Sequence, residues 1–380
     1  MPFTALGLPS AFQKALSEQN ITKPTPIQEA AIPVVLQGRD VLGIAQTGSG
    51  KTASFVLPVL TNLQKDTRLR NRQVKVLVVV PTRELAVQIN EVFWQFNKVL
   101  PERVKSLAVF GGVSINPQMK ALQNTHILVA TPGRLIELVE SNAVSLKDVE
   151  TLVLDEADKL LNKGFKEELH KILSFLPKKR QNLLFSATLS KDVANIQDIL
   201  LKNPVVVKVE PPENHIDLIT QSAWLVTDEK KGPLLRYLIR ENNMEQVLVF
   251  TSSVYKANNV VDKLKKNGVV AMAIHSKKSQ GARTEALHLF KTGKLSVLVT
   301  TDLLSRGIDI EFLPYVINYE LPRSPKDYIH RIGRTGRAEN AGEAISLVTE
   351  EDLHHFKVIQ KKMKKWVALS YSEELDLKGY

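Results

Sequence analysis

Short runs of Val, Ile and Leu recur along the whole chain, and they constrain its fold more than any other feature. The runs do not alternate apolar with polar residues, which is the pattern of strands buried on both faces of a parallel sheet. Segments of helix length, such as 83–100 and 254–267, separate them. We therefore predict an α/β fold with two mainly parallel sheets in tandem, each flanked by helices. The predicted strands are 41–45, 75–80, 106–110, 127–130, 151–154 and 182–185 in the first half, and 246–250, 269–274, 296–300, 315–319 and 344–348 in the second.

The chain divides near its middle. Its 380 residues suffice for two or three domains, each with its own core. Two prolines stand among charged residues at 210–214, and proline resists both helix interiors and central strands. The two halves are candidates for structural duplicates whose sequences have diverged. We predict a first domain over 1–208, a linker over 209–215, a second domain over 216–370 and a short extension over 371–380.

Composition excludes several classes of protein. The chain has no cysteine, which excludes disulfides, thiolate catalysis and metal sites built from cysteine. No apolar run approaches the ~18 residues of a membrane span, and residues 1–20 lack the pattern of a secretory signal, so we expect a cytoplasmic protein that does not enter a membrane. The net charge of +11 fits a nucleic-acid partner. A basic surface kept for solubility is the alternative.

The sequence AQTGSGKT at 45–52 lies between a predicted strand and a helical stretch. Gly48 and Gly50 let the backbone curl so that consecutive N–H groups point at phosphate oxygens, and a helix N-terminus favours an anion. Lys51 would reach the β- and γ-phosphates, and the Thr52 hydroxyl would ligate Mg²⁺. The first glycine of the general pattern is alanine here. The alternative is a structural glycine-rich turn, but the strand–helix context favours a phosphate loop.

The predicted strand at 151–154 ends in the acidic sequence DEAD at 155–158. The carboxyl ends of strands are where open α/β sheets bind ligands. Asp155 would hold a metal ion, and Glu156 would orient or deprotonate an attacking water. An acidic helix N-cap is the alternative, and it would be favoured for an isolated DEAD tetrapeptide. The phosphate-loop sequence upstream favours the catalytic interpretation.

With these two motifs placed, the chain resembles the DEAD-box ATP-dependent RNA helicases of superfamily 2. The resemblance covers nearly the whole chain, and the stretch 314–343 is most similar to the bacterial RhlE-like branch. Ten motifs occur in the order of the family. They are KPTPIQ at 23–28, AQTGSGKT at 45–52, PTRELA at 81–86, GG at 111–112, TPGR at 131–134, DEAD at 155–158, SAT at 186–188, QGAR at 280–283, TD at 301–302 through RGID at 306–309, and HRIGRTGR at 330–337.

The resemblance implies two RecA-like domains that bind ATP and Mg²⁺ between them. Gln28 would contact adenine, because an amide offers both a donor and an acceptor to the base edge, and Phe3 would pack nearby. Without the family, Gln28 would be read as a surface glutamine after a proline turn. Ile21 stands where many relatives have an aromatic residue that stacks on the base, so nucleotide affinity is expected to be modest. The implied nucleotide-binding residues are Phe3, Gln28, Ala45, Gln46, Thr47, Gly48, Ser49, Gly50, Lys51, Thr52 and Asp309.

The resemblance also assigns the chemistry. Two arginines of the second domain would neutralise charge that develops on the γ-phosphate during transfer. From composition alone, these arginines would be read as part of a basic helix. Thr52 and Asp155 would hold the metal, and Ser186 and Thr188 would couple the DEAD segment to domain closure. The implied catalytic residues are Lys51, Asp155, Glu156, Arg334 and Arg337.

RNA is the implied partner. Backbone amides, hydroxyls and arginines in loops suit phosphate and sugar contacts, so binding is expected to be largely independent of base sequence, with 2′-hydroxyl contacts distinguishing RNA from DNA. Ser276 and Lys277 replace the usual Gly-Asp of the family, which would either strengthen RNA contact or leave a solvated charge. His354-His355 is predicted to be a polar helix face. The lysine-rich stretch 361–365 is predicted to be a solvated helix face, with RNA contact as the alternative. The implied RNA-binding residues are Pro81, Thr82, Arg83, Gly111, Gly112, Thr131, Gly133 and Arg134 in the first domain, and Gln280, Arg283, Thr301 and Arg306 in the second.

We therefore predict a monomeric ATP-dependent RNA helicase that unwinds short duplexes or remodels RNA–protein complexes. ATP and RNA would both favour a closed state, and hydrolysis would reopen it. An ATP-gated RNA clamp with little unwinding is the alternative, because it would use the same residues. A DNA translocase is disfavoured by the DEAD sequence together with Gln28. Residues 366–380 are short and mixed in charge, so the basic tail of many relatives is either absent or removed.

Overall fold

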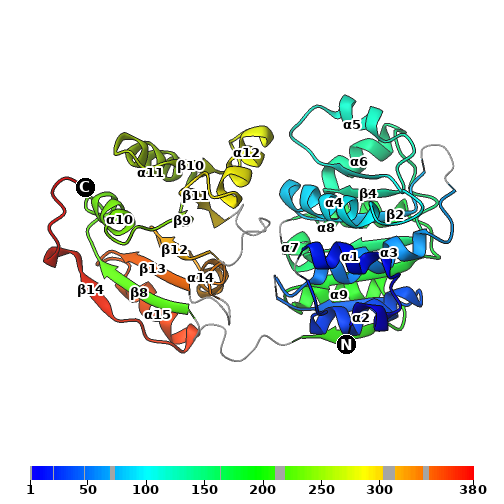
Figure 1. The fold of residues 1–380 in the computed structure, drawn as a ribbon, viewed down its shortest axis with the longest axis horizontal. Helices are drawn as coiled ribbons and strands as arrows, with labels where there is room; N and C mark the ends of the chain where they lie inside the picture. The colour runs from blue at the N-terminus through cyan, green and yellow to red at the C-terminus, as the bar shows by residue number, and fades with distance from the viewer. Residues whose placement is uncertain are drawn as a thin grey trace. The chain divides into compact units, whose positions relative to one another are not determined.

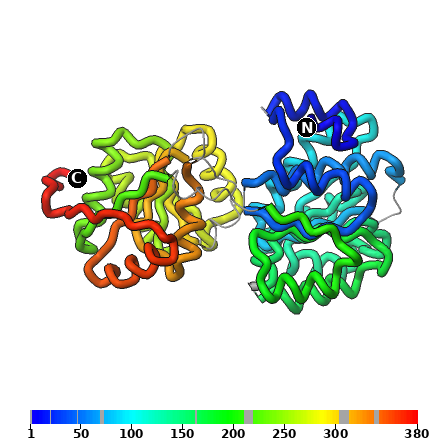
Figure 2. The backbone as a smooth tube through the Cα atoms, turned by 90° about the horizontal axis from the view of Figure 1, so that it is seen from below, coloured from blue at the N-terminus to red at the C-terminus, as the bar shows by residue number. Residues whose placement is uncertain are grey.

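The computed structural model forms two compact units, Met1–Pro211 and Pro212–Tyr380. Each unit is one continuous stretch of the chain (Figure 2), and each is described by itself. Most of the predicted linker lies outside the described residues. The structure describes residues 2–19, 21–46, 48–68, 73–162, 164–209, 219–302, 313–336 and 342–380.

The first unit contains a seven-stranded sheet in the order β3-β4-β2-β5-β6-β1-β7 (Figure 1). Every pairing in it is parallel. Its strands are β1 (Val41–Ile44), β2 (Val76–Val79), β3 (Ser106–Val109), β4 (Ile127–Ala130), β5 (Thr151–Leu154), β6 (Gln181–Ser186) and β7 (Val205–Lys208).

The second unit repeats this arrangement. Its seven-stranded sheet has the order β10-β11-β9-β12-β13-β8-β14, again with parallel pairings. When the strands of each unit are counted from its own first strand, the two orders are identical. The predicted tandem α/β fold is confirmed, and the units share one topology. The strands are β8 (Ile219–Leu225), β9 (Val247–Thr251), β10 (Ala271–Ile274), β11 (Val297–Thr301), β12 (Tyr315–Asn318), β13 (Gly342–Val348) and β14 (Leu369–Tyr371).

Helices connect the strands in both units. The two predicted helices are confirmed as α4 and α11, which end at Asn97 and Lys266. Among the described residues, no helix combines the length and apolar character that a bilayer span requires. The first unit has η1 (Phe3–Leu6), α1 (Ala11–Glu18), α2 (Pro26–Leu36), α3 (Lys51–Leu63), α4 (Arg83–Asn97), α5 (Ile115–Ala121), α6 (Pro132–Glu140), α7 (Ala157–Asn162), α8 (Lys166–Ser174) and α9 (Lys191–Leu200). The second has α10 (Lys231–Glu241), α11 (Val254–Lys266), α12 (Gln280–Lys291), α14 (Pro325–Ile332), α15 (Leu353–Met363) and η2 (Ser372–Glu374).

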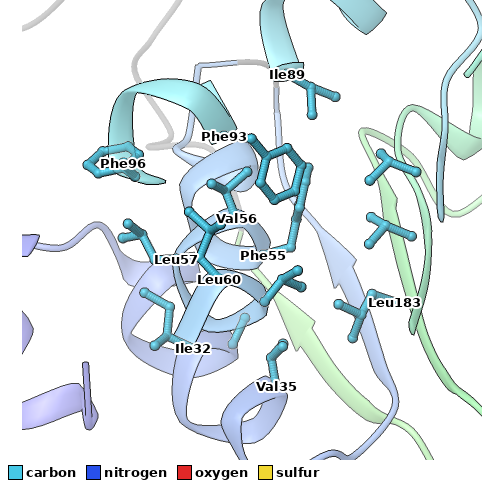
Figure 3. Close-up of a cluster of buried hydrophobic side chains, with 14 of the residues drawn as sticks. Ile32, Val35, Phe55, Val56, Leu57, Leu60, Ile89, Phe93, Phe96 and Leu183 are labelled. Atoms are coloured by element: carbon cyan, nitrogen blue, oxygen red, sulfur yellow. The ribbon is translucent and has the colours of Figure 1, made fainter. Parts of the chain in front are cut away.

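The central strands are buried on both faces, as predicted. In β2, Val76 and Val78 join the cluster formed with α1 to α4, whereas Leu77 and Val79 join the cluster on the opposite face. Figure 3 shows the first cluster, in which the Phe55 ring of α3 lies 5.4 Å from the Phe185 ring, measured between centroids. Burial on both faces explains why these strands carry no alternation of polar residues.

Three strands were not predicted: β7, β8 and β14. β7 and β14 lie at sheet edges and β8 lies next to an edge, so solvent reaches part of each strand. β8 accordingly includes Thr220, Gln221 and Ser222 among its residues. β14 extends to Tyr371, so the second sheet includes one residue of the predicted C-terminal extension.

Gly43 allows two neighbouring strands to pack. It pairs with Phe185 of β6, and a Cβ at this position would lie 2.5 Å from the Phe185 ring. Gly43→Ala should therefore lower the free energy of unfolding by about 1–3 kcal/mol, because the ring must move within a packed core. Urea unfolding followed by far-ultraviolet circular dichroism measures the change.

Phe185→Leu provides the matched control, because it removes the ring. In the Phe185→Leu background, Gly43→Ala should lower the free energy of unfolding by a clearly smaller amount. The difference is the coupling energy between the two positions. An equal cost in both backgrounds would show that the ring is not the constraint.

Candidate functional site

The predicted nucleotide and coupling residues of the first unit gather at one edge of its sheet. β5, β6 and β1 are consecutive neighbours in the strand order, and parallel strands point their carboxyl ends the same way. The phosphate loop follows β1, the DEAD segment follows β5, and Ser186 closes β6. The fold therefore brings three distant sequence motifs to the same place.

The phosphate loop depends on its glycines. Gly48 and Gly50 have φ angles of 78° and 90°, in the left-handed region that favours glycine. A Cβ on Gly50 would clash with the Gln28 amide and would lie 2.8 Å from Thr25 Oγ1. The loop ends where α3 begins at Lys51. Thr47 lies outside the described residues.

The start of α2 supports the phosphate loop through side-chain hydrogen bonds. Gln28 Oε1 accepts a hydrogen bond from Thr25 N at 2.9 Å, and Gln28 Nε2 donates to Gly50 O at 3.1 Å. Thr25 Oγ1 donates to Ser49 O at 2.7 Å. Both ends of the Gln28 amide thus have partners within the protein, and its adenine contact stays a prediction. Thr25 was missed, although the T-x-x-Q spacing signals a capping box.

Phe3 and Ile21 belong to the apolar side of this region. Phe3 is buried in the same hydrophobic cluster as the residues of α2, and Ile21 packs against that cluster. Their positions support α2, which carries Gln28. The base contact predicted for Phe3 remains a prediction.

Lys51 is buried beneath the phosphate loop. Its Nζ donates to Ala45 O at 2.6 Å and to Gln46 O at 2.7 Å. Burial lowers the pKa of Lys51, because a desolvated ammonium is disfavoured, and the carboxylates of Asp155 and Glu156 oppose this effect. The loop carbonyls hold the cation in the position from which it would meet phosphate oxygens. Thr52 is half-buried in the first turn of α3.

Asp155 and Glu156 differ in their surroundings. Burial raises the pKa of Asp155 to about 6, with Lys51 opposing the rise and Glu156 adding to it. Glu156 has a φ of 53°, an uncommon backbone conformation for a residue with a side chain and one enriched at functional sites. Its Oε1 pairs with Lys159 Nζ at 2.5 Å. Its Oε2 is buried with no hydrogen-bond partner among the described residues.

The hydroxyl of Thr52 and the carboxylate of Asp155 are oxygen donors of the kind that fits Mg²⁺. The ion prefers oxygen ligands and usually keeps several waters, with one or two carboxylates and substrate phosphates completing its shell. Among the residues that the structure describes, no cluster of three or more His, Asp or Glu could hold a metal ion without a substrate. Thr52 and Asp155 would supply the direct oxygen ligands, and the unpartnered oxygens Glu156 Oε2 and Asp158 Oδ1 are acceptors for nearby water molecules.

The segment Ser186–Thr188 is tied to the DEAD segment. Thr188 Oγ1 donates to Asp158 Oδ2 at 3.3 Å. Ser186 Oγ donates to Thr188 O at 2.8 Å and accepts from Thr188 N at 3.3 Å. The loop after β6 is therefore hydrogen-bonded to the start of α7, and the coupling role of Ser186 and Thr188 stays a prediction.

The predicted RNA loops of the first unit support one another. The Arg83 guanidinium occupies the space that a side chain on Gly112 would need. Arg134 is buried, and it donates to Glu137 Oε2 at 2.8 Å and to Val113 O at 2.7 Å. Arg134 thus holds the loop after β3 against α6, and its direct contact with RNA stays a prediction.

The other predicted RNA residues of this unit lie at the ends of β2, β3 and β4. Thr82 caps α4 by accepting a hydrogen bond from Leu85 N at 3.3 Å, and Thr131 precedes α6. Pro81 is buried. A Cβ on Gly111 or Gly133 would meet no atom within 4 Å, so the protein leaves room there for a close approach by a ligand.

The second unit is organised around a buried arginine that the sequence interpretation missed. Arg331 Nε and Nη2 donate to Asp302 at 2.5 and 2.8 Å, and Nη1 donates to Asn318 Oδ1 at 3.0 Å and to Glu320 O at 2.6 Å. Its guanidinium also lies 4.9 Å from the centroid of the Phe250 ring. Arg331 thus fixes α14 to the ends of β9, β11 and β12. The signal was its place as the first arginine of HRIGRTGR.

The remaining predicted residues of this unit are only partly described. Arg334 is buried in the turn that follows α14, and Thr301 closes β11. Gln280 and Arg283 lie in the first turn of α12, where Arg283 is buried. Ser276 and Lys277 are exposed. Arg306, Asp309 and Arg337 lie outside the described residues.

His275 stands beside these two departures from the family pattern. Its Nε2 lies 3.0 Å from Asn258 Oδ1. Burial lowers the pKa of His275, and the positive charges of Lys278, Arg283 and Lys277 add to this effect. The ring therefore connects the start of the loop between β10 and α12 to Asn258 of α11.

Comparison with known proteins agrees with this arrangement. The family model described as DEAD/DEAH box helicase matches residues 25–196, and the model described as helicase conserved C-terminal domain matches residues 230–339. The chain is 38% identical to the DEAD-box ATP-dependent RNA helicase CshA of Geobacillus kaustophilus, over 98% of this chain and 80% of that protein. It is 39% identical to the ATP-dependent rRNA helicase RRP3 of Gibberella zeae, over 100% of this chain and 77% of that protein.

A solved structure shows the same fold. S. cerevisiae Dbp5 bound to RNA and ADP BeF3 matches with a TM-score of 0.82 and 30% identity, over 97% of this chain and 95% of that one. Placement in the RhlE-like branch stays a prediction. The chain belongs to the DEAD-box family of ATP-dependent RNA helicases, and it is an ATP-hydrolysing enzyme built from two tandem RecA-like domains.

Proposed function

We propose that the protein is a monomeric cytoplasmic RNA helicase that separates short duplexes or remodels RNA–protein complexes. ATP binding would close its two domains on RNA, and hydrolysis would reopen them. The observation that carries this proposal is the group formed by Lys51, Asp155 and Glu156 at the carboxyl edge of the first sheet. We propose domain limits of 1–208 and 216–370, with residues 209–215 as the linker and 371–380 as a short extension.

The first domain would hold the triphosphate. The loop amides would bind phosphate oxygens, and Lys51 would exchange the carbonyls of Ala45 and Gln46 for the β- and γ-phosphates. Thr52 and Asp155 would hold Mg²⁺, which when bound supplies charge neutralisation. Lys159 occupies Oε1 of Glu156, so Oε2 is left to orient the attacking water.

The second domain would supply cationic groups to the γ-phosphate. Arg334 and Arg337 are proposed for this role, and Asp309 is proposed to contact the ribose. Arg331 is a positioning residue, because its hydrogen bonds to Asp302, Asn318 and Glu320 fix the helix that precedes Arg334. Arginine at such a position stabilises charge that develops during phosphoryl transfer.

RNA would bind mainly through its backbone. The proposed contacts are loop residues of both domains rather than aromatic platforms, so base sequence should matter little. Hydroxyl contacts to the ribose would distinguish RNA from DNA. The network from Ser186 through Thr188 to Asp158 supports a coupling of RNA-driven closure to the catalytic carboxylates.

ATP turnover should depend on RNA and on Glu156. We expect RNA to stimulate hydrolysis and DNA to fail. Glu156→Gln should keep ATP binding but reduce turnover by about 10²–10⁴-fold, because geometry survives while basicity is lost. Turnover is measured without nucleic acid, with RNA and with DNA, beside unwinding of a short RNA duplex.

Glu167→Gln, at an exposed position on α8, is the matched control and should behave like the wild type. A Glu156→Gln protein with normal RNA-stimulated turnover would refute the assignment. RNA-dependent turnover without unwinding would favour the clamp.

Backbone contact with RNA should appear in the salt dependence of binding. Log affinity should fall linearly with log salt, with a slope of ~0.7 per phosphate neutralised on a single strand. Arg83→Ala should flatten that slope by about 0.7 and weaken different sequences equally. Fluorescence anisotropy with two RNAs of unrelated sequence measures both quantities.

Lys178→Ala removes an exposed charge elsewhere in the same unit and should change neither quantity. A loss confined to one of the two RNA sequences would contradict the backbone contact.

Arg337 should couple the two ligands. Arg337→Ala should retain ATP but lose turnover by about 10³-fold, by analogy with arginine fingers. ATP and RNA should each tighten the other by the same factor in the wild type, and the replacement should shrink that factor. RNA affinity is titrated with and without a non-hydrolysable ATP analogue.

Arg331→Lys tests the positioning role in the same titration, because it keeps the charge but not the forked contacts. Unchanged turnover and coupling in Arg337→Ala would show that the second domain serves another purpose.

A further inference from the structure

Helix α15 is amphipathic and carries its basic residues toward solvent. Phe356, Ile359 and Met363 are buried in a cluster with residues of α14 and β13. Lys357 and Lys361 are exposed on the other face, together with His354, Val358 and Lys362. The exposure of Lys361 and Lys362 agrees with both interpretations of this stretch, a solvated face and a face that contacts RNA. His355 is half-buried, and its Nε2 lies 2.8 Å from Pro322 O.

The turn after α15 presents a tryptophan. Lys364 ends the helix with a φ of 57°, a left-handed position that glycine normally occupies. The chain then reverses, and Trp366 follows with 71% of its surface exposed. Such exposure is large for a tryptophan, since this residue is usually well buried.

The backbone on both sides of Trp366 is anchored. Lys365 Nζ donates to Ile219 O at 3.1 Å, and Val367 N donates to the buried Gln360 Oε1 at 2.7 Å. Leu369 then pairs with Ala223 in the sheet. The ring is thus held in solvent by a rigid turn, and it contributes little to packing.

The charged residues of this stretch of the chain have one sign. Residues 353–371 contain five lysines and no aspartate or glutamate. Lys365 is engaged with Ile219, and among the described residues the other four form no ion pair. We use the name α15 surface for Lys357, Lys361, Lys362, Lys364 and Trp366.

The α15 surface lies at the opposite edge of the second sheet from the proposed RNA loops. Ile219 is the first residue of β8, so Lys365 marks the amino-terminal edge. Thr301 closes β11 at the carboxyl edge, and the loop before α12 follows the carboxyl end of β10. Figure 1 shows α15 beside the β8 and β14 side of the sheet. The two surfaces are therefore separate sites on one domain.

We propose that the α15 surface is a second, sequence-independent binding site for single-stranded RNA. Lysines provide point charges for successive phosphates, and an exposed indole provides a platform on which any base can stack. The family identity makes RNA the polyanion that this protein meets, which favours it over an acidic protein or an anionic lipid. The inference goes beyond the proposed function, and it rests on that function only in naming RNA.

The charge test compares two matched triple variants of the full chain. Lys357→Gln, Lys361→Gln and Lys364→Gly together should flatten the log–log salt slope by about 2, since each lost phosphate contact removes ~0.7. Lys364→Gly also favours the left-handed cap, so a binding loss cannot be ascribed to a broken turn. Lys263→Gln, Lys265→Gln and Lys266→Gln remove three exposed charges from α11, which packs on the other face of the sheet, and should leave the slope unchanged.

The stacking test uses the ring itself. Trp366→Ala should weaken affinity for an oligo-uridine by about 10-fold, and Trp366→Phe should restore most of it. The chain has three tryptophans. RNA should quench tryptophan fluorescence in the wild type and in Trp94→Phe, where another exposed tryptophan is replaced, and the quenching should be lost in Trp366→Phe.

Titrations with and without a non-hydrolysable ATP analogue separate the two sites. The lysine and Trp366→Ala variants should lose affinity by the same factor in both conditions, leaving the coupling between ATP and RNA intact. If ATP and RNA do not tighten each other's binding in the wild type, the proposed domain closure is refuted but the α15 surface is not. The inference would be overturned if these variants kept the wild-type RNA affinity, salt slope and fluorescence quenching. The same conclusion would follow if the variants kept RNA binding and lost binding to an acidic peptide or an anionic vesicle instead.

Discussion

The direction of parallel strands is the constraint on which the candidate site depends. Because β1, β5 and β6 are neighbours that run the same way, their carboxyl ends place the phosphate loop, the DEAD segment and Ser186 together. Residues more than a hundred positions apart in the sequence are therefore brought close together by the strand order alone. The strands that carry these loops are packed on both faces, each face in its own apolar cluster, which gives the loops a well-packed support.

The charged side chains at this edge of the sheet interact with one another and act as one group. Burial lowers the pKa of Lys51 and raises that of Asp155, each of these two charges opposes the shift of the other, and the Glu156 carboxylate acts on both. Burial disfavours every charge, while opposite charges nearby offset part of that cost. Lys159 pairs with one oxygen of Glu156, and loop carbonyls hold Lys51. A bound triphosphate would therefore replace existing partners rather than meet bare charges, which limits the reorganisation that binding requires.

The sequence predicted the central strands, the tandem architecture and the grouping of motifs, because each has a local signature. Buried parallel strands are continuous apolar runs, and the loops at their ends carry glycine or carboxylates. It failed for some strands and for contacts that only the fold creates. β8 and β14 lie at or next to a sheet edge and carry polar residues, whereas β7 has the apolar run Val205–Val207 and was missed although its signal is local. Arg331 reads as a surface arginine until the fold surrounds it with Asp302, Asn318 and Phe250. Gln28 and Arg134 have partners inside the protein that their motifs did not reveal.

The two units share one topology, but they differ in the loop that follows their first strand. The segment after β8 in the second sheet is the counterpart of the loop after β1, since both follow the first strand of their unit. It contains no glycine between Val226 and Lys231, and Lys231 pairs with Asp228 at 3.1 Å instead of facing an open cradle. A turn without glycine, whose lysine is already paired with Asp228, lacks the backbone freedom to curl around phosphates. The same fold therefore accepts different loops at this position, and the residues of the loop decide whether it can bind phosphate. The first unit has the glycine-containing loop, and the second has a buried arginine network in which Arg331 fixes α14.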